Sequence, residues 1–436
     1  MWTVEIRLGT QKRQEGEAVK KVVLSSMIGN GLEWYDYALY GQMAWLLSTL
    51  FFPQGDAFVQ MLAVYGVFAA GFVVRPLGAI FFGWLGDTYG RRLSMVVAIL
   101  MMAIPTGLIG ALPTYTQIGI WAPILLTLIR LLQGMSLGGE FSGSIAYVVE
   151  HAPAKKRGIA GASALVSMML GFLLGLFVVK GLIALLGQDA FEAWGWRIPF
   201  LTGVIIGLVG FYIRNKCSES PAYEAAKEGG HLSEQPLREA FRTHKAAMLQ
   251  GLVIYITVTM PFYLTTIYFI GFSKVHLGLI PADAIKLSVY NMLALLLMMP
   301  ISAWVSDKIG RKKVMMAAAT VMLFAAYPIF SHLVEGIGFQ TIMLAQLAFA
   351  LILGVYVGPV AALLVEMFPT SVRFTGMAIA YNMSAAVFGG TSPMVCEWLL
   401  KSFGDARAIA AYVMASCIAS LIAFTFYRDG YNEELR

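Results

Sequence analysis

The sequence has little charge and few cysteines. Asp, Glu, Lys and Arg together make up 13% of its 436 residues, whereas a soluble domain carries about 25%. The three cysteines, Cys217, Cys396 and Cys417, show neither metal-ligand nor disulfide spacing. The histidines are scattered, and no nucleophile–base set stands out. We therefore expect no metal, no cofactor and no enzyme activity.

Apolar residues, in contrast, are abundant. They make up 58% of the chain, and the mean hydropathy is +0.73. A helix needs about 20 mostly apolar residues to cross the hydrocarbon core of a membrane. Six such runs lie near 22–47, 58–84, 92–112, 119–149, 158–187 and 196–214, and six more near 246–272, 283–306, 313–333, 339–366, 375–400 and 405–427. This pattern predicts an all-α integral membrane protein with 12 transmembrane helices in two six-helix bundles.

The loops between these runs predict the orientation of the chain. Lys and Arg gather on one side, while the other side has only Lys274, Lys401 and Arg407 in its loops. Both termini are therefore expected in the cytoplasm of a bacterium, with the protein multi-pass in the inner membrane and no nucleic acid as partner. The predicted parts are a cytoplasmic N-terminal segment (1–21), an N-terminal bundle (22–214), a cytoplasmic central loop (215–245), a C-terminal bundle (246–427) and a cytoplasmic tail (428–436).

One short charged turn occurs twice in the sequence. Gly83-Trp84-Leu85-Gly86-Asp87-Thr88-Tyr89-Gly90-Arg91-Arg92 follows the second run, and Asp307-Lys308-Ile309-Gly310-Arg311-Lys312-Lys313 follows the eighth. An acid at a helix end accepts hydrogen bonds from backbone N–H groups and arginines. The turn predicts a network that closes an inner gate, although a plain positively charged loop would also fit. The expected gating residues are Arg75, Gly83, Asp87, Gly90, Arg91, Arg92, Glu150, Asp307, Gly310, Arg311, Glu366 and Arg373, with substrate contact as an alternative for Arg75.

The repeated turn resembles the signature loop of the major facilitator superfamily, G-x-L-x-D-x-x-G-R-R/K. The resemblance implies two six-helix halves around a central cavity, which expose a substrate site to each side in turn by alternating access.

The first run carries two acids. Glu33, Asp36, Tyr37 and Tyr40 recur at spacings of three and four, so they share one face of a helix. Acids inside a membrane span are costly and are rarely without a role. They predict a proton-coupling site, although a structural ion pair is the alternative, and the two tyrosines are expected to line a substrate site.

The fourth run carries a polar stripe that includes Arg130, Gln133 and Glu140. Arg130 lies well inside the span, so it needs a carboxylate from Asp36, Glu33 or a substrate. Arg130 and Gln133 are therefore expected to bind substrate, and Glu140 joins the candidate proton-coupling acids.

Three motifs together carry a closer resemblance. They are G-N-x-x-E-W-x-D at Gly29–Asp36, R-P-x-G from Arg75, and R-x-x-Q-G-x-x-x-G-G-E at Arg130–Glu140. They resemble the metabolite:H+ symporter family, with wording closest to the proline/betaine porters and similarity to the 2-oxoglutarate and citrate porters. The chain departs from the proline/betaine porters at Arg130, where they have lysine. No heptad run follows the twelfth run, so osmosensing by a coiled-coil tail is not expected.

The second half has almost no charge inside its runs. Tyr263, Asn291 and Tyr381 fall near mid-span and are expected either to hydrogen-bond the substrate or to serve in packing. The first half would then handle protons and charge, and the second half would shape the pocket.

The sequence thus predicts a secondary active transporter for proton-coupled symport of a small carboxylated metabolite into the cell. The substrate classes left open are an organic acid, a zwitterionic osmolyte and a carboxylate siderophore, and Arg130 slightly favours the acids unless an internal ion pair occupies it. The expected partners are the small-molecule substrate, protons and the lipid bilayer, and the chain is expected to be a monomer. The alternatives are a proton-coupled exporter and a ligand sensor that does not transport.

Overall fold

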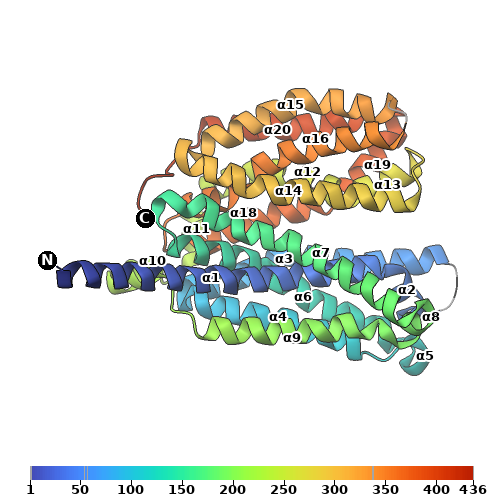
Figure 1. The fold of residues 1–436 in the computed structure, drawn as a ribbon, viewed down its shortest axis with the longest axis horizontal. Helices are drawn as coiled ribbons and strands as arrows, with labels where there is room; N and C mark the ends of the chain where they lie inside the picture. Colours follow the sequence, from blue (N-terminus) through green and yellow to red (C-terminus); the bar gives the residue numbers. More distant parts are fainter. Residues whose placement is uncertain (1, 54, 56, 336–337, 436) are drawn as a thin grey trace. The chain divides into compact units, whose positions relative to one another are not determined.

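The computed structural model describes residues 2–53, 55, 57–335 and 338–435 (Figure 1). Over these residues the chain forms helices joined by short loops, which confirms the predicted all-α class. The chain divides into two compact units. Unit 1 comprises Met1–Pro153, Ser167–Pro236 and Thr370–Thr375, and unit 2 comprises Ala154–Val166, Leu237–Pro369 and Gly376–Arg436. The units therefore differ from the predicted halves, because each contains a short segment from the other half of the sequence.

In unit 1, helices α3, α4, α6 and α9 lie side by side, and α1 packs on α6 and α9 (Figure 1). Helix α7 begins in unit 2 and continues in unit 1. The helices of this part are α1 (Trp2–Gln42), α2 (Ala44–Phe51), α3 (Ala57–Tyr89), α4 (Arg91–Ala111), α5 (Tyr115–Ile118), α6 (Trp121–His151), α7 (Arg157–Leu186), α8 (Gln188–Ala190), α9 (Arg197–Asn215) and α10 (Pro221–Glu228).

In unit 2, α16 packs on α14 and α15, and α20 packs on α12 and α15. The helices are α11 (Pro236–Thr243), α12 (Lys245–Tyr263), α13 (Phe269–Val275), α14 (Pro281–Ile309), α15 (Arg311–Glu335), α16 (Phe339–Val357), α17 (Val360–Glu366), α18 (Arg373–Ser384), α19 (Ser392–Phe403) and α20 (Arg407–Thr425). A π-helical turn joins α12 to α13, and another follows α18.

Ten helices of the described chain are long and apolar enough to cross a membrane. They correspond to ten of the twelve predicted runs. The run near 375–400 is divided between α18, a π-helical turn and α19, so no single helix there is long enough. The run near 22–47 lies in α1 and α2, which are separated at Met43, and Glu33 and Asp36 lower its apolar character. Helix α1 also begins far ahead of this apolar run, so the helix continues through the predicted N-terminal segment (1–21), of which Met1 lies outside the described residues.

Both copies of the charged turn end a helix at a glycine with positive φ. Gly90 has φ 108° and separates α3 from α4, while Gly310 has φ 103° and separates α14 from α15. Side chains disfavour this backbone region, and glycine adopts it readily. The glycine in each copy therefore sets the sharp change of direction at the end of the helix.

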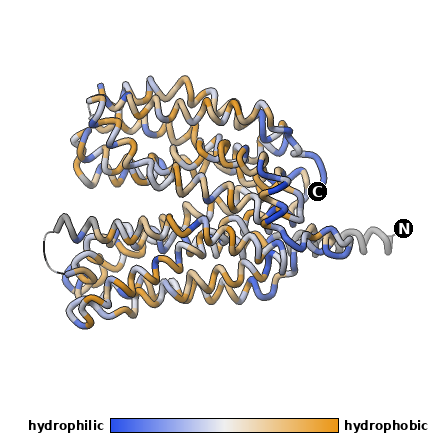
Figure 2. Tube along the Cα trace, turned by 180° about the vertical axis from the view of Figure 1, so that it is seen from behind, coloured by the Kyte–Doolittle hydropathy of each residue, from blue (hydrophilic) through white to orange (hydrophobic). Residues whose placement is uncertain are grey.

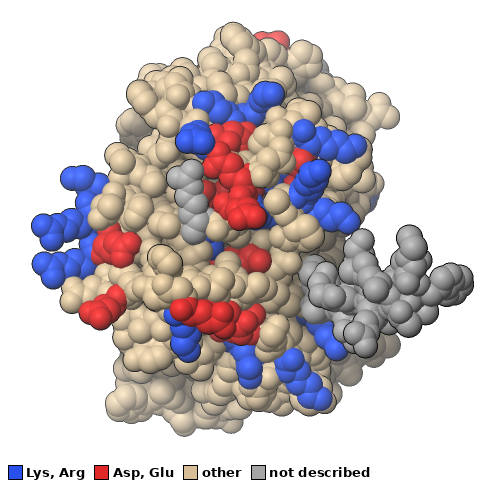
Figure 3. All heavy atoms as spheres, turned by 90° about the vertical axis from the view of Figure 1, so that its left-hand side faces the viewer, with Lys and Arg blue, Asp and Glu red and all other residues tan. Residues whose placement is uncertain are grey.

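The distribution of polar residues fits helices embedded in a bilayer. Hydrophobic residues follow the long helices of each unit, and hydrophilic residues gather toward the helix ends (Figure 2). The end at which the C-terminus lies carries many Lys, Arg, Asp and Glu side chains (Figure 3). The charged turns therefore lie away from the apolar middle of the helices.

Candidate functional site

Asp36 on α1 and Arg130 on α6 form a buried ion pair inside unit 1. Arg130 Nη1 lies 2.5 Å from Asp36 Oδ2. The other carboxylate oxygen of Asp36 accepts hydrogen bonds from Thr106 on α4 and from Gln133, each at 3.0 Å. The guanidinium of Arg130 also lies 3.9 Å from the ring centre of Tyr40. Of the three partners expected for Arg130, the structure supplies Asp36, and it brings the predicted Gln133 and Tyr40 to the same pair.

Glu33 lies one turn before Asp36 and has a different environment. Its side chain is 1% exposed, and neither of its carboxylate oxygens has a hydrogen-bond partner among the described residues. Asn30, one turn earlier on the same face, is also fully buried, and neither atom of its amide group has a partner in the described chain. A buried polar group without a partner is costly. Helix packing alone therefore does not explain why Asn30 and Glu33 are buried in this stretch of α1.

Glu140, the third predicted acid, is bound to Arg214 in the last turn of α9. Arg214 Nη1 donates to Glu140 Oε2 at 2.7 Å, and a second contact joins Arg214 Nη2 to Glu140 Oε1. Ser144 donates to the same carboxylate at 3.0 Å. A Cβ on Gly29 would collide with both charged groups, so this glycine leaves room for the pair. Sequence reasoning missed Arg214 because it placed the residue at the end of a span; a single arginine in an apolar helix was the available signal.

Tyr37 and Arg75 lie close to the same aromatic ring. Tyr37 is half-buried and contacts Phe72 edge-on, with ring centres 5.7 Å apart. Arg75 is buried on α3, with its guanidinium 5.5 Å from the centre of the Phe72 ring. Arg75 also attracts the Glu33 carboxylate electrostatically, and its predicted gating role stays a prediction.

In unit 2, the predicted Asn291 belongs to a buried chain of hydrogen bonds. Asn291 Nδ2 donates to Gln346 Oε1 at 2.9 Å, and Gln346 Nε2 donates to Ser273 Oγ at 2.8 Å. Asn291 Oδ1 has no partner among the described residues. Gln346 was missed by sequence reasoning, although it is an amide inside an apolar run. This series of hydrogen bonds therefore leaves Asn291 Oδ1 available to a hydrogen-bond donor.

The two tyrosines predicted in this unit are buried in aromatic contacts. Tyr381 meets Tyr255 edge-on with ring centres 5.0 Å apart. Tyr263 contacts Phe262 with ring centres 5.9 Å apart. Packing thus accounts for much of their surface, and their predicted substrate contact stays a prediction.

The first copy of the charged turn binds the start of α18 inside unit 1. Asp87 accepts hydrogen bonds from the backbone N–H groups of Phe374 at 3.1 Å and Thr375 at 2.8 Å. Asp87 is also paired with Arg91 at 2.9 Å. A Cβ on Gly83 would lie 2.7 Å from Thr375 Cα, so glycine permits this close approach. Asp87 therefore caps α18, as its position at a helix end suggests.

Arg91 and Glu150 extend this network. Arg91 donates to the carbonyl oxygens of Gly86 at 2.7 Å and Thr370 at 2.9 Å. Glu150 accepts from Arg373 at 2.7 Å, from Arg91 at 3.4 Å and from Ser220. Four predicted gating residues, Asp87, Arg91, Glu150 and Arg373, thus meet in one buried network. The side chain of Arg92, which is half-buried, instead donates to the carbonyl oxygen of Asn215 at 2.8 Å.

The second copy repeats this arrangement inside unit 2. Asp307 accepts hydrogen bonds from the backbone N–H groups of Gly158 at 2.7 Å and Ile159 at 3.0 Å, in the first turn of α7. Arg311 is paired with Asp307 at 2.7 Å and with Glu366 at 3.1 Å. Each unit therefore holds a helix start from the other half of the sequence by the aspartate of its own turn.

A second acid caps the helix that follows each turn. Glu219 accepts from the backbone N–H of Arg91 at 3.1 Å and of Arg92 at 3.2 Å. Asp429 accepts from the backbone N–H of Lys312 at 2.9 Å. Burial raises the pKa of the Glu219 carboxyl above its ordinary value, against hydrogen bonds from Ser220 and Arg92 that lower it. Neither acid was predicted as a site residue; the signal was their recurrence just after the last helix of each bundle.

Comparison with known proteins gives consistent matches along the whole chain. The family model described as "Sugar (and other) transporter" matches residues 22–246 and 230–429. The "Glycine betaine/proline/ectoine/pipecolic acid transporter OusA" of Dickeya dadantii is 34% identical over 96% of this chain and 85% of its own length. The "Inner membrane metabolite transport protein YhjE" of Escherichia coli is 33% identical over 95% of both chains.

The fold also matches solved structures. The proton:xylose symporter XylE bound to 6-bromo-6-deoxy-D-glucose has a TM-score of 0.78, with 19% identity over 97% of this chain and 98% of that one. At this level of identity the likeness concerns the fold.

Proposed function

This chain belongs to the sugar (and other) transporter family of the major facilitator superfamily, and on that premise we propose that it imports a zwitterionic osmolyte of the proline or betaine class together with protons. The predicted family and the wording close to proline/betaine porters are confirmed. So is the prediction that the chain is a multi-pass inner-membrane transporter and not an enzyme. Substrate, coupling and the roles of single residues belong to the proposal.

The observation that carries the proposal is the buried Asp36–Arg130 pair beside Glu33, whose carboxylate accepts no hydrogen bond among the described residues. A zwitterion offers one carboxylate and one cationic nitrogen. Arg130 suits the carboxylate, and an acid on α1 suits the nitrogen. A di- or tricarboxylate would bring further negative charges next to the carboxylates of Glu33 and Asp36. Among the three predicted substrate classes, the zwitterionic osmolyte therefore fits best. The names of the relatives, which are transporters of betaine, proline and ectoine, support the same class.

Proton coupling would depend on Glu33 and Asp36. No hydrogen bond among the described residues stabilises the charge of Glu33, although Arg75 attracts it electrostatically. Taking up a proton would therefore remove a costly buried charge. A proton on Asp36 would weaken its hold on Arg130 and free the guanidinium for the substrate carboxylate. Binding of the proton then changes the affinity for substrate, which is what coupling requires. Glu140 is assigned a structural role in this proposal, because Arg214 already neutralises it.

The two turn networks would control access to the site. Asp87 and Asp307 each hold a helix start by backbone hydrogen bonds, and such contacts can be made in one transport state and broken in the other. We place these networks on the cytoplasmic side, as the distribution of Lys and Arg predicts. Alternating access would require the networks to open in each cycle.

Uptake into proteoliposomes tests this proposal. Radiolabelled proline, betaine, 2-oxoglutarate and citrate would each be supplied with and without an inward proton gradient. Accumulation of proline or betaine that depends on the gradient supports the proposal. Accumulation of a di- or tricarboxylate instead would overturn the substrate class, and uptake that is indifferent to the gradient would overturn the coupling.

A further inference from the structure

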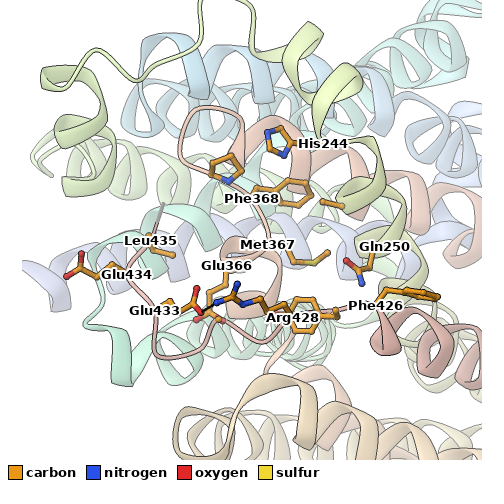
Figure 4. Close-up of a pocket in the computed structure, with 14 residues that line it drawn as sticks. His244, Gln250, Glu366, Met367, Phe368, Phe426, Arg428, Glu433, Glu434 and Leu435 are labelled. Carbon is orange, nitrogen blue, oxygen red and sulfur yellow. Dashed lines mark hydrogen bonds and ion pairs between the residues drawn. The ribbon is translucent and has the colours of Figure 1, made fainter.

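Unit 2 contains a cavity of about 440 Å³ at the point where the C-terminal segment folds over α12 and α17 (Figure 4). Its volume lies in the range of small-molecule sites, roughly 300–1,000 Å³. Three carboxylates line it, from Glu366, Glu433 and Glu434, against one guanidinium, from Arg428. Arg428 is paired with Glu433 at 2.8 Å. The wall therefore carries an excess of negative charge.

Glu366 occupies the place in unit 2 that Glu150 occupies in unit 1. Each lies at the end of a helix and accepts from the arginine of its own turn, Arg91 for Glu150 and Arg311 for Glu366. Glu150 has two further donors, Arg373 at 2.7 Å and the hydroxyl of Ser220. A second guanidinium and a hydroxyl thus complete the shell of this carboxylate.

Glu366 lacks both of these donors. Its side chain is 2% exposed, and among the described residues it accepts hydrogen bonds from Arg311 alone, at 3.1 and 3.3 Å. Arg157 attracts it electrostatically, but Arg157 Nη1 donates to the carbonyl oxygen of Glu433 at 2.7 Å. A carboxylate has about four acceptor positions, so Glu366 presents unused acceptor capacity to the cavity it lines.

Tyr427 supplies an independent observation. It lines the same cavity and is 5% exposed, yet its hydroxyl has no hydrogen-bond partner in the described chain. In unit 1, by contrast, the hydroxyl of Tyr223, which lies near the first network, donates to the carbonyl oxygen of Thr88 at 2.9 Å. An orphaned hydroxyl beside an under-coordinated carboxylate marks a place that a polar ligand would complete.

We propose that this cavity binds a small organic cation with an ammonium or guanidinium group, which donates to Glu366 and to the hydroxyl oxygen of Tyr427. Phe368 and Phe426 also line the cavity and offer rings to the aliphatic part of the ligand or to its charge. The ligand would do in unit 2 what Arg373 and Ser220 do for Glu150 in unit 1.

The site is connected to the charged turn of its own unit. Glu366 holds Arg311, and Arg311 holds Asp307, which caps the first turn of α7. A cation bound to Glu366 would restrain the first residue of the connected series Glu366, Arg311 and Asp307. The proposal therefore assigns the cavity a regulatory role, separate from the Asp36–Arg130 pair.

Titration calorimetry of the purified full-length protein with agmatine, which carries a guanidinium and an ammonium, tests the proposal. Saturable binding is expected, and glutarate, a dianion of similar length, should not bind. Tyr427→Phe removes a hydroxyl that makes no bond in the free protein, so it should leave folding intact and weaken agmatine about tenfold. Glu366→Gln should weaken it by a larger factor, since a charged acceptor is lost.

Two control variants locate the binding. Tyr223→Phe removes a tyrosine hydroxyl near the first network, in unit 1, and should leave the affinity for agmatine unchanged. Glu33→Gln tests whether agmatine enters the proposed transport site instead. The proposal is overturned if agmatine shows no saturable binding up to about 10 mM. It is equally overturned if Glu33→Gln abolishes binding, or if Tyr427→Phe and Glu366→Gln leave it intact. Because the readout is binding, a failure of the proposed transport function would not affect it.

Discussion

Asp87 and Thr375 lie 288 residues apart in the chain and meet in a hydrogen bond of 2.8 Å. The carboxylate of Asp87 accepts this hydrogen bond from the backbone N–H of Thr375. In the other unit, Asp307 accepts a hydrogen bond from the backbone N–H of Gly158 at 2.7 Å. A carboxylate on backbone N–H groups at a helix start gains both hydrogen bonds and a favourable interaction with the helix dipole. The same device therefore holds one helix start in each unit.

Replacing Asp87 by alanine should destabilise the protein by about 2 kcal/mol, because a buried charge-assisted cap is lost. Thermal unfolding of the purified protein measures the loss, and the rate of substrate uptake should fall as well. Asp307→Ala is the matched variant and should behave alike. Unchanged stability and uptake in both variants would show that the caps have no such role.

Removing one member of the Asp36–Arg130 pair should cost more than removing both. Arg130→Ala leaves a buried carboxylate unpaired, which costs about 3–5 kcal/mol, and uptake should be abolished. The double variant Asp36→Asn with Arg130→Gln should recover most of the stability but not the uptake. Folding is checked by the unfolding temperature. Normal uptake by a folded Arg130→Ala variant would remove this residue from the substrate site.

Glu33→Gln should separate proton coupling from folding. The carboxylate makes no hydrogen bond in the described chain, so its neutral isostere should keep the unfolding temperature. Gradient-driven accumulation should be lost while exchange of labelled for unlabelled substrate continues. Glu140→Gln is the control, and it should lower stability by about 3 kcal/mol because Arg214 loses its partner. Gradient-driven accumulation at the wild-type level in Glu33→Gln would contradict the assignment.

The buried carboxyl of Glu219 should make stability depend on pH. Burial raises its pKa in the folded protein above the ordinary value, so between the two values the folded state holds a proton that the unfolded state has lost. Stability should therefore rise as the pH falls through the folded pKa, and should fall as the pH rises. The difference in unfolding free energy between wild type and Glu219→Gln, followed from neutral pH downward, measures this contribution. A wild type that weakens relative to the variant over this window would give the opposite sign.

Ten of the predicted spans and the repeated turn could be predicted from the sequence because each depends on local pattern. A run of apolar residues predicts a membrane helix wherever it lies in the sequence. Gly90 and Gly310 follow the acids of their turns, Asp87 and Asp307, at the same spacing. The expectation that Arg130 needs a carboxylate followed from the cost of a buried charge. The choice of Asp36 over Glu33 required packing, because both acids lie on one face of α1.

Other site residues depended on tertiary contacts that no local pattern contains. Arg214 reaches Glu140 across 74 positions of the chain, through the space left by Gly29. Gln346 could be recognised as a site residue only through its hydrogen bonds with Asn291 and Ser273. The start of α1 at Trp2 lies outside what the apolar run can predict, because the polar residues ahead of position 22 carry no membrane signal although they continue the helix.

The exchange of short segments between the units has a consequence for biosynthesis. Residues Thr370–Thr375 belong to unit 1, so a ribosome completes most of that unit long before it makes the N–H groups that Asp87 needs. The nascent first half must wait in the membrane with Asp87 and Glu150 lacking their late partners. Translation of residues Thr370–Thr375, just ahead of the eleventh predicted span, is therefore the step that finishes the first unit, and chains truncated before it should be preferred substrates for membrane proteases.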